Sequence, residues 1–157
     1  MAVDMSYYGT VEDADTYFAA LLRRDLWFDA TPQEKQQALV AATKQIDRLN
    51  FKWEKVESDQ VLQFPRTADP DVVVTEVPEA IEAATYELAY TLMNDVDPDA
   101  EFRNEKRQSH TFNSIKTTID SSFVQEHIHA GIPSSSAWNL LLPYLEPVME
   151  FTMQRVS

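Results

Sequence analysis

The stretch TPQEKQQALVAATKQIDRLN, residues 31–50, contains the strongest helix signal in the chain. Thr31 at the N-cap, Pro32 at the first helical position and Glu34 two residues later form a capping box with a pre-set first φ. Apolar residues then recur every three or four positions, which is the spacing of one buried helix face: Leu39, Ala42, Ile46 and Leu49. The pattern predicts a helix from about Pro32 to Asn50.

A second helix is predicted nearer the start of the chain. Thr10 is suited to be its N-cap, and Glu12 and Asp13 are acidic residues in the first turn, where the helix dipole favours anions. An apolar stripe follows, made of Tyr17, Phe18, Leu21 and Leu22. Arg23 and Arg24 are expected to end this helix, and Leu26-Trp27-Phe28 is expected to pack back onto the bundle.

A third helix is predicted to start near Pro78, with the proline at its first position. One apolar face recurs at helical spacing through Ile81, Ala84, Leu88 and Leu92. Between this helix and the one before it, residues 51–77 lack a helical period and contain turn residues such as Asp69-Pro70-Asp71. We therefore expect an irregular loop held by aromatic anchors.

The last third of the sequence has a different character. Residues 111–119 are rich in β-branched side chains, which predicts a strand or a hairpin. A short apolar helix is predicted over residues 137–145, with Pro143 stopping or kinking it and Ser134-Ser135-Ser136 capping it. The tail from Val148 to Met153 stays apolar.

These elements predict a mainly α fold: a small bundle of three to five helices with an inserted β-hairpin or extended loop and a C-terminal arm. We expect residues 1–100 to form the core bundle, residues 101–131 the insertion, and residues 132–157 the last helix and the docking arm, within a single domain. The alanine-rich helices make a thin core, and exposed apolar arms usually mark partner surfaces. Composition therefore favours an interaction module.

The composition excludes several classes of protein. The chain has 157 residues, which suits one domain, and only two glycines, which fits neither the dinucleotide-binding fingerprint nor the P-loop. Cysteine is absent, which excludes disulfides, thiolate zinc sites and cysteine nucleophiles. No apolar run approaches the roughly 18–20 residues that cross a bilayer. The first residues lack the features of a secretory signal, so we expect a soluble protein without a membrane partner.

The charge is strongly negative and unevenly distributed. The chain has 26 acidic and 13 basic residues, for a net charge of −13. Residues 65–100 contain nine acids and one base, a net charge of −8. This excess argues against duplex-DNA binding, which needs clustered Lys and Arg. We expect one negative face, for which a solvated helix face with acidic loops is the simplest interpretation.

The sequence contains no credible catalytic or metal-binding constellation. Asp95, Asp97 and Asp99 resemble the start of a calcium loop, but Lys106 stands where the bidentate glutamate would be. The pair His127-x-His129 could share a strand face, but no third ligand accompanies it. We therefore expect a protein that is not an enzyme, with no cofactor and no metal.

The order of several motifs resembles the head–tail connector, or adaptor, proteins of tailed bacteriophages. The resemblance covers about residues 6–145. Its motifs are Tyr8-Gly9-Thr10-Val11-Glu12-Asp13-Ala14-Asp15-Thr16-Tyr17-Phe18, then Lys35-x-x-Ala38-Leu39-x-x-Ala42-Thr43-x-x-Ile46-Asp47, Trp53, Gln63-Phe64-Pro65-Arg66, Pro78-x-x-Ile81-x-x-Ala84-x-x-Glu87-Leu88-Ala89, and Ile132-Pro133 to Pro143. Some members of that family are labelled DnaT-like single-stranded-DNA-binding proteins. The chain departs from the pattern after Trp53, where Glu54 stands in place of a frequent glycine.

The resemblance implies a structural virion protein made in the host cytoplasm and located at the head–tail interface. Such adaptors form a homo-oligomeric ring, usually of twelve copies, between the portal protein and a distal tail component such as a nozzle, stopper or tail-tube protein. Duplex DNA is only passing cargo in their channel. The acidic stretch of residues 65–100 could then line that channel and repel phosphates.

The resemblance also suggests roles for particular residues. We expect docking to the portal, a neighbouring copy or the tail through Phe64, Pro65, Arg66, Phe112, Ile115, Ile119, Phe151, Met153 and Val156. For the motif Phe64-Pro65-Arg66, a purely intramolecular turn is an equally good interpretation. We expect bundle anchors at Trp27, Trp53, Trp138, Leu141 and Leu142.

Two functional hypotheses of different classes follow. The first is the ring adaptor of a virion, which predicts ring assembly and little affinity for DNA. The alternative is a DnaT-like single-stranded-DNA-binding module, which predicts salt-sensitive binding to oligonucleotides despite the acidic charge. An acidic DNA mimic is a third possibility, which the apolar arm does not suggest.

Overall fold

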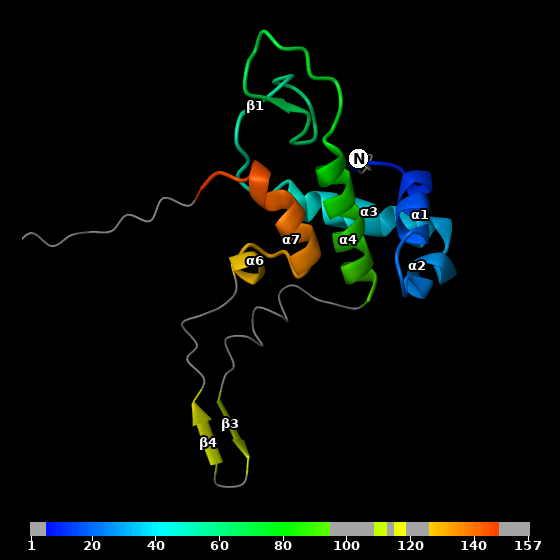
Figure 1. The fold of residues 1–157 in the computed structure, drawn as a ribbon, viewed down its shortest axis with the longest axis vertical. Helices are drawn as coiled ribbons and strands as arrows, with labels where there is room; N and C mark the ends of the chain where they lie inside the picture. Colours follow the sequence, from blue (N-terminus) through cyan, green and yellow to red (C-terminus); the bar gives the residue numbers. More distant parts are fainter. Residues whose placement is uncertain (1–5, 95–108, 113–114, 119–125, 148–157) are drawn as a thin grey trace, which may run out of the picture.

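The computed structural model describes residues 6–94, 109–112, 115–118 and 126–147. Its centre is α4 (Glu79–Met93), which packs against α3 (Pro32–Ile46) and against α7 (Ser135–Leu141) (Figure 1). The short helices α1 (Val11–Ala19) and α2 (Asp25–Asp29) lie on the other side of α4 from α7. The fold is mainly helical, which confirms the predicted fold class.

The starts of α1, α3 and α7 follow the local sequence closely, whereas α4 starts at Glu79, with Pro78 as its extended N-cap and not as its first residue. Thr31 accepts a hydrogen bond from the Glu34 backbone N–H, and the Glu34 side chain accepts one from the Thr31 backbone, so the predicted capping box is present. Thr10 caps α1 by accepting from the Asp13 backbone N–H at 3.0 Å. Ser134 caps α7 in the same way through the Ala137 N–H. Each cap satisfies an amide that the helix itself leaves without a partner.

The helix ends depart from the predictions. The first helix stops at Ala19, and Arg23 has a left-handed φ of 58°, so the expected stripe breaks before Leu21 and Leu22. Leu22 is consequently 87% exposed. The helix from Pro32 ends at Ile46, four residues before the expected end. Helix ends depend on what the chain packs against next, which periodicity does not encode.

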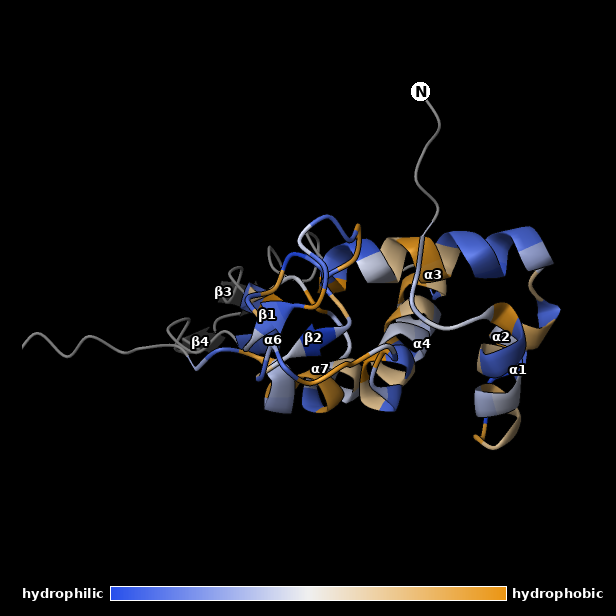
Figure 2. Ribbon diagram, turned by 90° about the horizontal axis from the view of Figure 1, so that it is seen from above, coloured by the Kyte–Doolittle hydropathy of each residue, from blue (hydrophilic) through white to orange (hydrophobic). Residues whose placement is uncertain are grey.

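The core lies along α4, where α3 and α7 pack on it and α1 and α2 add buried side chains, and Figure 2 shows hydrophobic stretches on α3, α4 and α7. The largest fully buried side chains include Trp27, Phe18, Leu39, Ile46, Ile81, Leu88, Ile132 and Leu141. Each large apolar side chain contributes roughly 1.5–3 kcal/mol when it is fully buried. Small residues on α4, such as Ala84 and Ala89, are also fully buried and allow the helices to approach closely.

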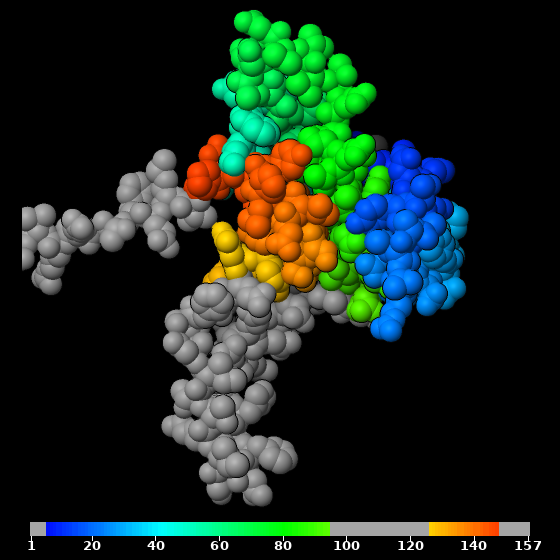
Figure 3. All heavy atoms as spheres, viewed as in Figure 1, coloured from blue at the N-terminus to red at the C-terminus, as the bar shows by residue number. Residues whose placement is uncertain are grey.

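Residues 51–77 form an irregular loop, as the sequence predicts, and Figure 3 shows this part of the chain as a lobe on the helical body. The loop contains a small antiparallel pair, β1 (Glu54–Lys55) and β2 (Arg66–Thr67). The expected aromatic anchors are present, because Phe51 and Phe64 are buried and their ring centroids lie 4.8 Å apart.

The predicted hairpin is also present. Strands β3 (Ser109–Phe112) and β4 (Ile115–Thr118) pair antiparallel with one another. The chain then forms a short helix, α6 (Glu126–His129), where the sequence suggested extended structure. After α7, the 3₁₀ turn η1 (Leu142–Tyr144) contains Pro143, which ends the α-helix as expected. No helix of the described residues is long and apolar enough to span a membrane.

Gly9 allows a close approach that any other residue would block. Its φ is +73°, and an added Cβ would overlap the Tyr86 ring. Gly131 has a similar φ of +78°, but an added Cβ there would meet nothing within 4 Å. Replacing either glycine would force a side-chain-bearing residue into a left-handed backbone conformation. Only at Gly9 would the added Cβ also clash with a neighbour.

We predict that Gly9→Ala destabilises the fold by about 2–4 kcal/mol. Alanine is disfavoured in the left-handed conformation of residue 9, and its Cβ would overlap the Tyr86 ring. The matched control, Gly131→Ala, should lose only about 1 kcal/mol, because the backbone cost acts alone. Urea unfolding followed by circular dichroism measures both. Equal losses for the two variants would contradict the packing of Tyr86 on Gly9.

Candidate functional site

The Tyr8 hydroxyl joins three segments that are distant in the sequence. It donates a short hydrogen bond to the Asp47 carboxylate just after α3. It accepts hydrogen bonds from the backbone N–H groups of Gln63 at 3.0 Å and Phe64 at 3.2 Å. The Tyr8 backbone N–H donates to the Thr43 hydroxyl at 3.2 Å. The loop of residues 51–77 is thereby tied to α3 and to the start of the chain.

The pKa values of this network follow from its burial. Burial raises the pKa of Tyr8, and the hydrogen bond to Asp47 and the charge of Asp47 raise it further. Burial also raises the pKa of Asp47, although the Tyr8 hydrogen bond, the Gln63 backbone N–H and the charge of Lys55 act in the opposite direction. At neutral pH the tyrosine remains a proton donor.

Arg66 organises the other end of the loop through neutral acceptors. Its Nε donates to the Lys52 carbonyl at 2.8 Å, and its Nη2 donates to the carbonyls of Phe51 and Trp53. Its Nη1 donates to the Gln63 side chain at 2.8 Å. Arg66 thus holds residues 51–53 in place without pairing with a carboxylate among the described residues.

Trp53 is presented to solvent by this scaffold. Its φ of 66° lies in the left-handed region, which is unusual for a bulky residue and requires support from its surroundings. The side chain is 45% exposed, and its ring meets Tyr144 edge-on with centroids 6.2 Å apart. Trp27 and Trp138 are buried, so Trp53 is the accessible tryptophan of the three.

Basic residues flank Trp53. Residues 44–66 contain five bases and four acids, a net charge of +1 within a chain of net charge −13. The Lys52 ammonium donates to the Pro143 carbonyl at 3.0 Å, and the Lys55 ammonium donates to the Gln60 carbonyl at 3.3 Å. Neither forms a salt bridge within the part of the chain that the structure describes. We name Lys52, Trp53, Lys55 and Tyr144 the Trp53 surface.

A groove of about 460 Å³ begins at Lys52, next to Trp53 in the chain. Trp138, Leu142 and Leu145 provide apolar wall, Asn50 and His129 provide polar groups, and Glu126 and Glu146 add two carboxylates. Backbone pairing joins two of the segments that line the groove, because Lys52 N–H donates to the Tyr144 carbonyl at 2.8 Å and Glu146 N–H donates to the Asn50 carbonyl at 3.0 Å. An apolar wall with a few polar groups is typical of a ligand groove.

Acidic residues lie near the start of α4. Burial raises the pKa of Glu82 on α4, and the charges of Asp13, Glu79 and Glu76 raise it further. These three carboxylates therefore lie close enough to Glu82 to repel its negative charge. A negative region of this kind repels phosphate groups.

A second polar cluster ties α1 and the chain after it to α4. Glu87 of α4 accepts from the Tyr17 hydroxyl at 3.0 Å and pairs with the Arg24 guanidinium at 3.4 Å. Burial, followed by the charge of Glu87, raises the pKa of Tyr17 to about 12. Glu87 is buried, its charge is paired with the Arg24 guanidinium, and it accepts a hydrogen bond from Tyr17. The cluster therefore stabilises the fold.

The expected docking residues of the loop have intramolecular partners. Phe64 is buried, and its ring meets Tyr8, Phe51 and Tyr144. Pro65 follows it through a cis peptide bond, and the Pro65 carbonyl accepts from the Val56 N–H. Arg66 donates to loop carbonyls, so the motif Phe64-Pro65-Arg66 forms an intramolecular turn. The sequence analysis gave such a turn as the alternative to docking. Docking through it remains a prediction.

The other expected docking residues are placed less fully. Phe112 and Ile115 are paired across the turn of the β3–β4 hairpin. Ile119, Phe151, Met153 and Val156 lie outside the described residues. The structure does not bring the described members of this set into one cluster.

The expected bundle anchors divide into two groups. Trp27, Trp138 and Leu141 are buried, and the Trp27 indole N–H donates to Asp15 at 2.7 Å. Trp53 and Leu142 are 45% and 43% exposed, which differs from the expected anchoring. A tryptophan in the irregular loop has no periodic partner, and its exposure depends on the left-handed turn at that residue.

Sequence reasoning did not single out Lys52, Lys55 or Tyr144. The available signal was an aromatic residue flanked by lysines, Lys52-Trp53-Glu54-Lys55, within a stretch that has no helical period. The metal hypothesis for His127 and His129 assumed a strand, but both lie in α6, where positions i and i+2 do not share a face. Within the described ranges, no group of three His, Cys, Asp or Glu residues is placed to hold a metal ion.

The fold and this surface define a small helical domain that presents an aromatic residue between lysines. A family model described as "Putative DnaT-like ssDNA binding protein" matches residues 2–156. The chain belongs to that family. The match agrees with the DnaT-like label that the sequence analysis noted for some members of the resembling family. Nothing in it indicates a phage head–tail connector. Neither the curated proteins nor the solved structures gave a match.

We predict that Tyr8→Phe destabilises the protein by about 2–3 kcal/mol, because Asp47 and two backbone N–H groups lose a buried partner. The neighbouring substitution Tyr7→Phe removes a hydroxyl outside this network and serves as the control. Chemical unfolding measures the loss, and acrylamide quenching reports whether Trp53 becomes more exposed. A Tyr8→Phe variant as stable as the wild type would contradict the role of this hydroxyl.

Proposed function

We propose that this protein binds single-stranded DNA through the Trp53 surface. The observation that carries the proposal is the exposed Trp53 ring, held in a left-handed conformation by Arg66 and set between Lys52 and Lys55. The family description independently names single-stranded DNA as the ligand. The proposal corresponds to the alternative hypothesis from the sequence.

The chemistry of the Trp53 surface suits a single strand. Unpaired bases expose their faces, and stacking of a base on an aromatic side chain is tolerant of sequence. Trp53 is 45% exposed, so a base can reach it without unfolding of the loop. Tyr144 meets Trp53 edge-on and leaves the outer part of the indole free to stack.

The local charge also favours a single strand over a duplex. Lys52 and Lys55 hydrogen-bond to neutral carbonyls and form no salt bridge among the described residues, so they can contact phosphates, although Asp47 and the exposed Glu54 partly offset the charge of this surface. Two or three cations can neutralise a short run of phosphates but not the dense charge of a duplex groove. The net charge of −13 opposes any nucleic acid at long range, so we expect modest affinity and short contacts.

We predict that Trp53→Ala weakens binding to a labelled thymidine oligonucleotide by about 1–3 kcal/mol, the usual contribution of one base–aromatic stack. Phe28→Ala is the control, since Phe28 is 49% exposed on α2 outside the Trp53 surface, and the cation over its ring, Lys35, is paired with Asp15. Fluorescence anisotropy at low salt measures both affinities.

Lys52→Gln and Lys55→Gln test the electrostatic part of the same interaction. Each substitution should reduce the slope of log affinity against log salt by roughly 0.7, the value for one phosphate contact on a single strand. Arg23→Gln, which lies far along the chain from this surface, should leave the slope unchanged. Wild-type protein without affinity at low salt, or a Trp53→Ala variant that binds normally, would refute the proposal.

A second candidate is the ring adaptor between a portal protein and a phage tail. It is favoured by the acidic side chains of Asp13, Glu76 and Glu79 close to Glu82, because an acidic wall would let duplex DNA pass without adhering. In this role the chain forms a ring with the portal protein and a distal tail component as partners.

Electron microscopy distinguishes this candidate from the first. The protein is mixed with the portal protein encoded in the same genome, and negative-stain images are compared with those of the portal alone. An added ring layer on one end of the portal is the result expected of an adaptor. Absence of added density, together with oligonucleotide binding that depends on Trp53, eliminates the adaptor and leaves the DNA-binding proposal.

A further inference from the structure

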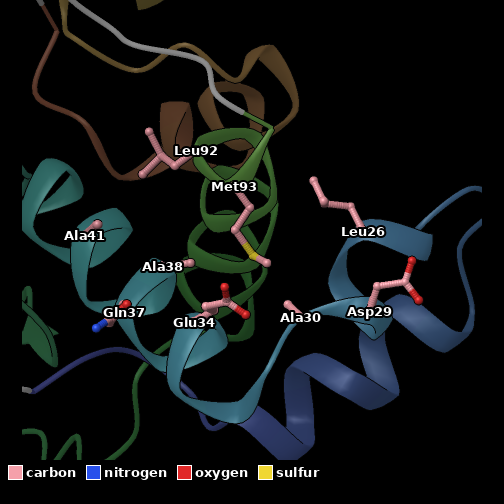
Figure 4. Close-up of a pocket in the computed structure, with 9 residues that line it drawn as sticks. All are labelled: Leu26, Asp29, Ala30, Glu34, Gln37, Ala38, Ala41, Leu92 and Met93. Carbon is pink, nitrogen blue, oxygen red and sulfur yellow. The ribbon is translucent and has the colours of Figure 1, made fainter.

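A second groove, distant in the sequence from Trp53, lies between α2, α3 and the end of α4. Its volume is about 500 Å³. Each of the three elements contributes apolar lining: Leu26 and Ala30, Ala38 and Ala41, and Leu92 and Met93. Figure 4 shows Leu26 and Met93 reaching into the space between α2 and α4. We name this feature the α2–α3–α4 groove.

Exposed apolar side chains also occur in and next to α2 along the chain. Leu26, which lines the groove, is 37% exposed, Phe28 on α2 is 49% exposed, and Leu22 just before α2 is 87% exposed. An apolar groove with an exposed large side chain on its lining is a surface on which another chain can pack.

The rim of the groove indicates the charge of its occupant. The carboxylates of Asp29 and Glu34 lie at the side formed by α2 and α3 (Figure 4). Hydrogen bonds from Thr31 lower the pKa of Glu34, which keeps this carboxylate ionised. An occupant that fits should therefore combine large apolar side chains with a cation.

The chain itself contains a segment with that chemistry. Half of residues 148–157 are large apolar side chains, namely Val148, Met149, Phe151, Met153 and Val156. Arg155 supplies a cation near the end of the segment, and Glu150 is its one acid. The apolar side chains match the groove lining, and Arg155 matches the acidic rim.

The geometry favours a second copy as the source of the segment. Glu146 N–H donates to the Asn50 carbonyl, so the chain leaves the body beyond the end of α3. Ala38 in the groove precedes Ile46, the last residue of α3, by eight helical residues, which is ~12 Å, and Asn50 follows four residues after the helix end. Phe151 follows Pro147 by four residues, which span at most ~14 Å. Its own groove is reached only at nearly full extension.

We propose that residues 148–157 of one copy dock in the α2–α3–α4 groove of a second copy. Phe151 enters between Leu26 and Met93, and Arg155 faces the acidic rim. The contact joins two different surfaces, so copies associate head to tail and can extend to a ring or a filament. The proposal does not depend on DNA binding, because the groove contains none of the residues of the Trp53 surface.

Sedimentation velocity of the full chain over a range of concentrations tests the association. Wild-type protein should gain mass as concentration rises. Phe151→Ala removes the main apolar anchor, and Ala41→Glu places a carboxylate on an exposed groove position. Each should weaken association at least tenfold, while Ala19→Glu, the same change on an exposed alanine of α1 outside the groove, should leave it unaltered.

Mixing the two defective variants separates docking between copies from docking within one chain. Phe151→Ala retains an intact groove, and Ala41→Glu retains an intact segment, so an equimolar mixture should form a 1:1 dimer and nothing larger. A wild-type chain that remains monomeric at high concentration overturns the proposal. A mixture that stays monomeric, when the wild type associates, also overturns it.

Discussion

The Tyr8 hydroxyl holds together the part of the molecule that regular secondary structure does not. It donates to Asp47 and accepts from the N–H groups of Gln63 and Phe64, so one side chain satisfies three polar groups from two distant segments. A buried carboxylate and two buried amides without partners would each cost free energy. Because Phe64 is thereby fixed in the core, Arg66 is fixed beside the carbonyls of residues 51–53, and Trp53 is turned outward.

The helical body provides the rigid platform for this loop. Helix α4 lies between α3 and α7, and its small residues Ala84 and Ala89 allow close packing on both sides. The loop leaves α3 and returns to α4, while the chain after α7 pairs with the loop through Lys52 and Tyr144. The Trp53 surface therefore joins two distant parts of the chain on one scaffold.

Charge separation reconciles an acidic chain with a DNA-binding proposal. The negative charge is concentrated outside residues 44–66, and Asp13, Glu76 and Glu79 lie close enough to Glu82 near the start of α4 to repel it. The cations near Trp53 hydrogen-bond to carbonyls instead of carboxylates. The same acidic excess that limits DNA affinity leaves the α2–α3–α4 groove with a rim suited to a basic, apolar segment.

The sequence by itself determined the fold class and the starts of α1, α3 and α7. Capping at Thr10, Thr31 and Ser134 is a local interaction between residues three apart, so it can be predicted without tertiary structure. The end of α1, the exposure of Trp53 and the Tyr8 network were decided only by the tertiary structure. These features depend on contacts between residues tens of positions apart, such as Tyr8 with Phe64, and neither periodicity nor composition records which distant groups meet.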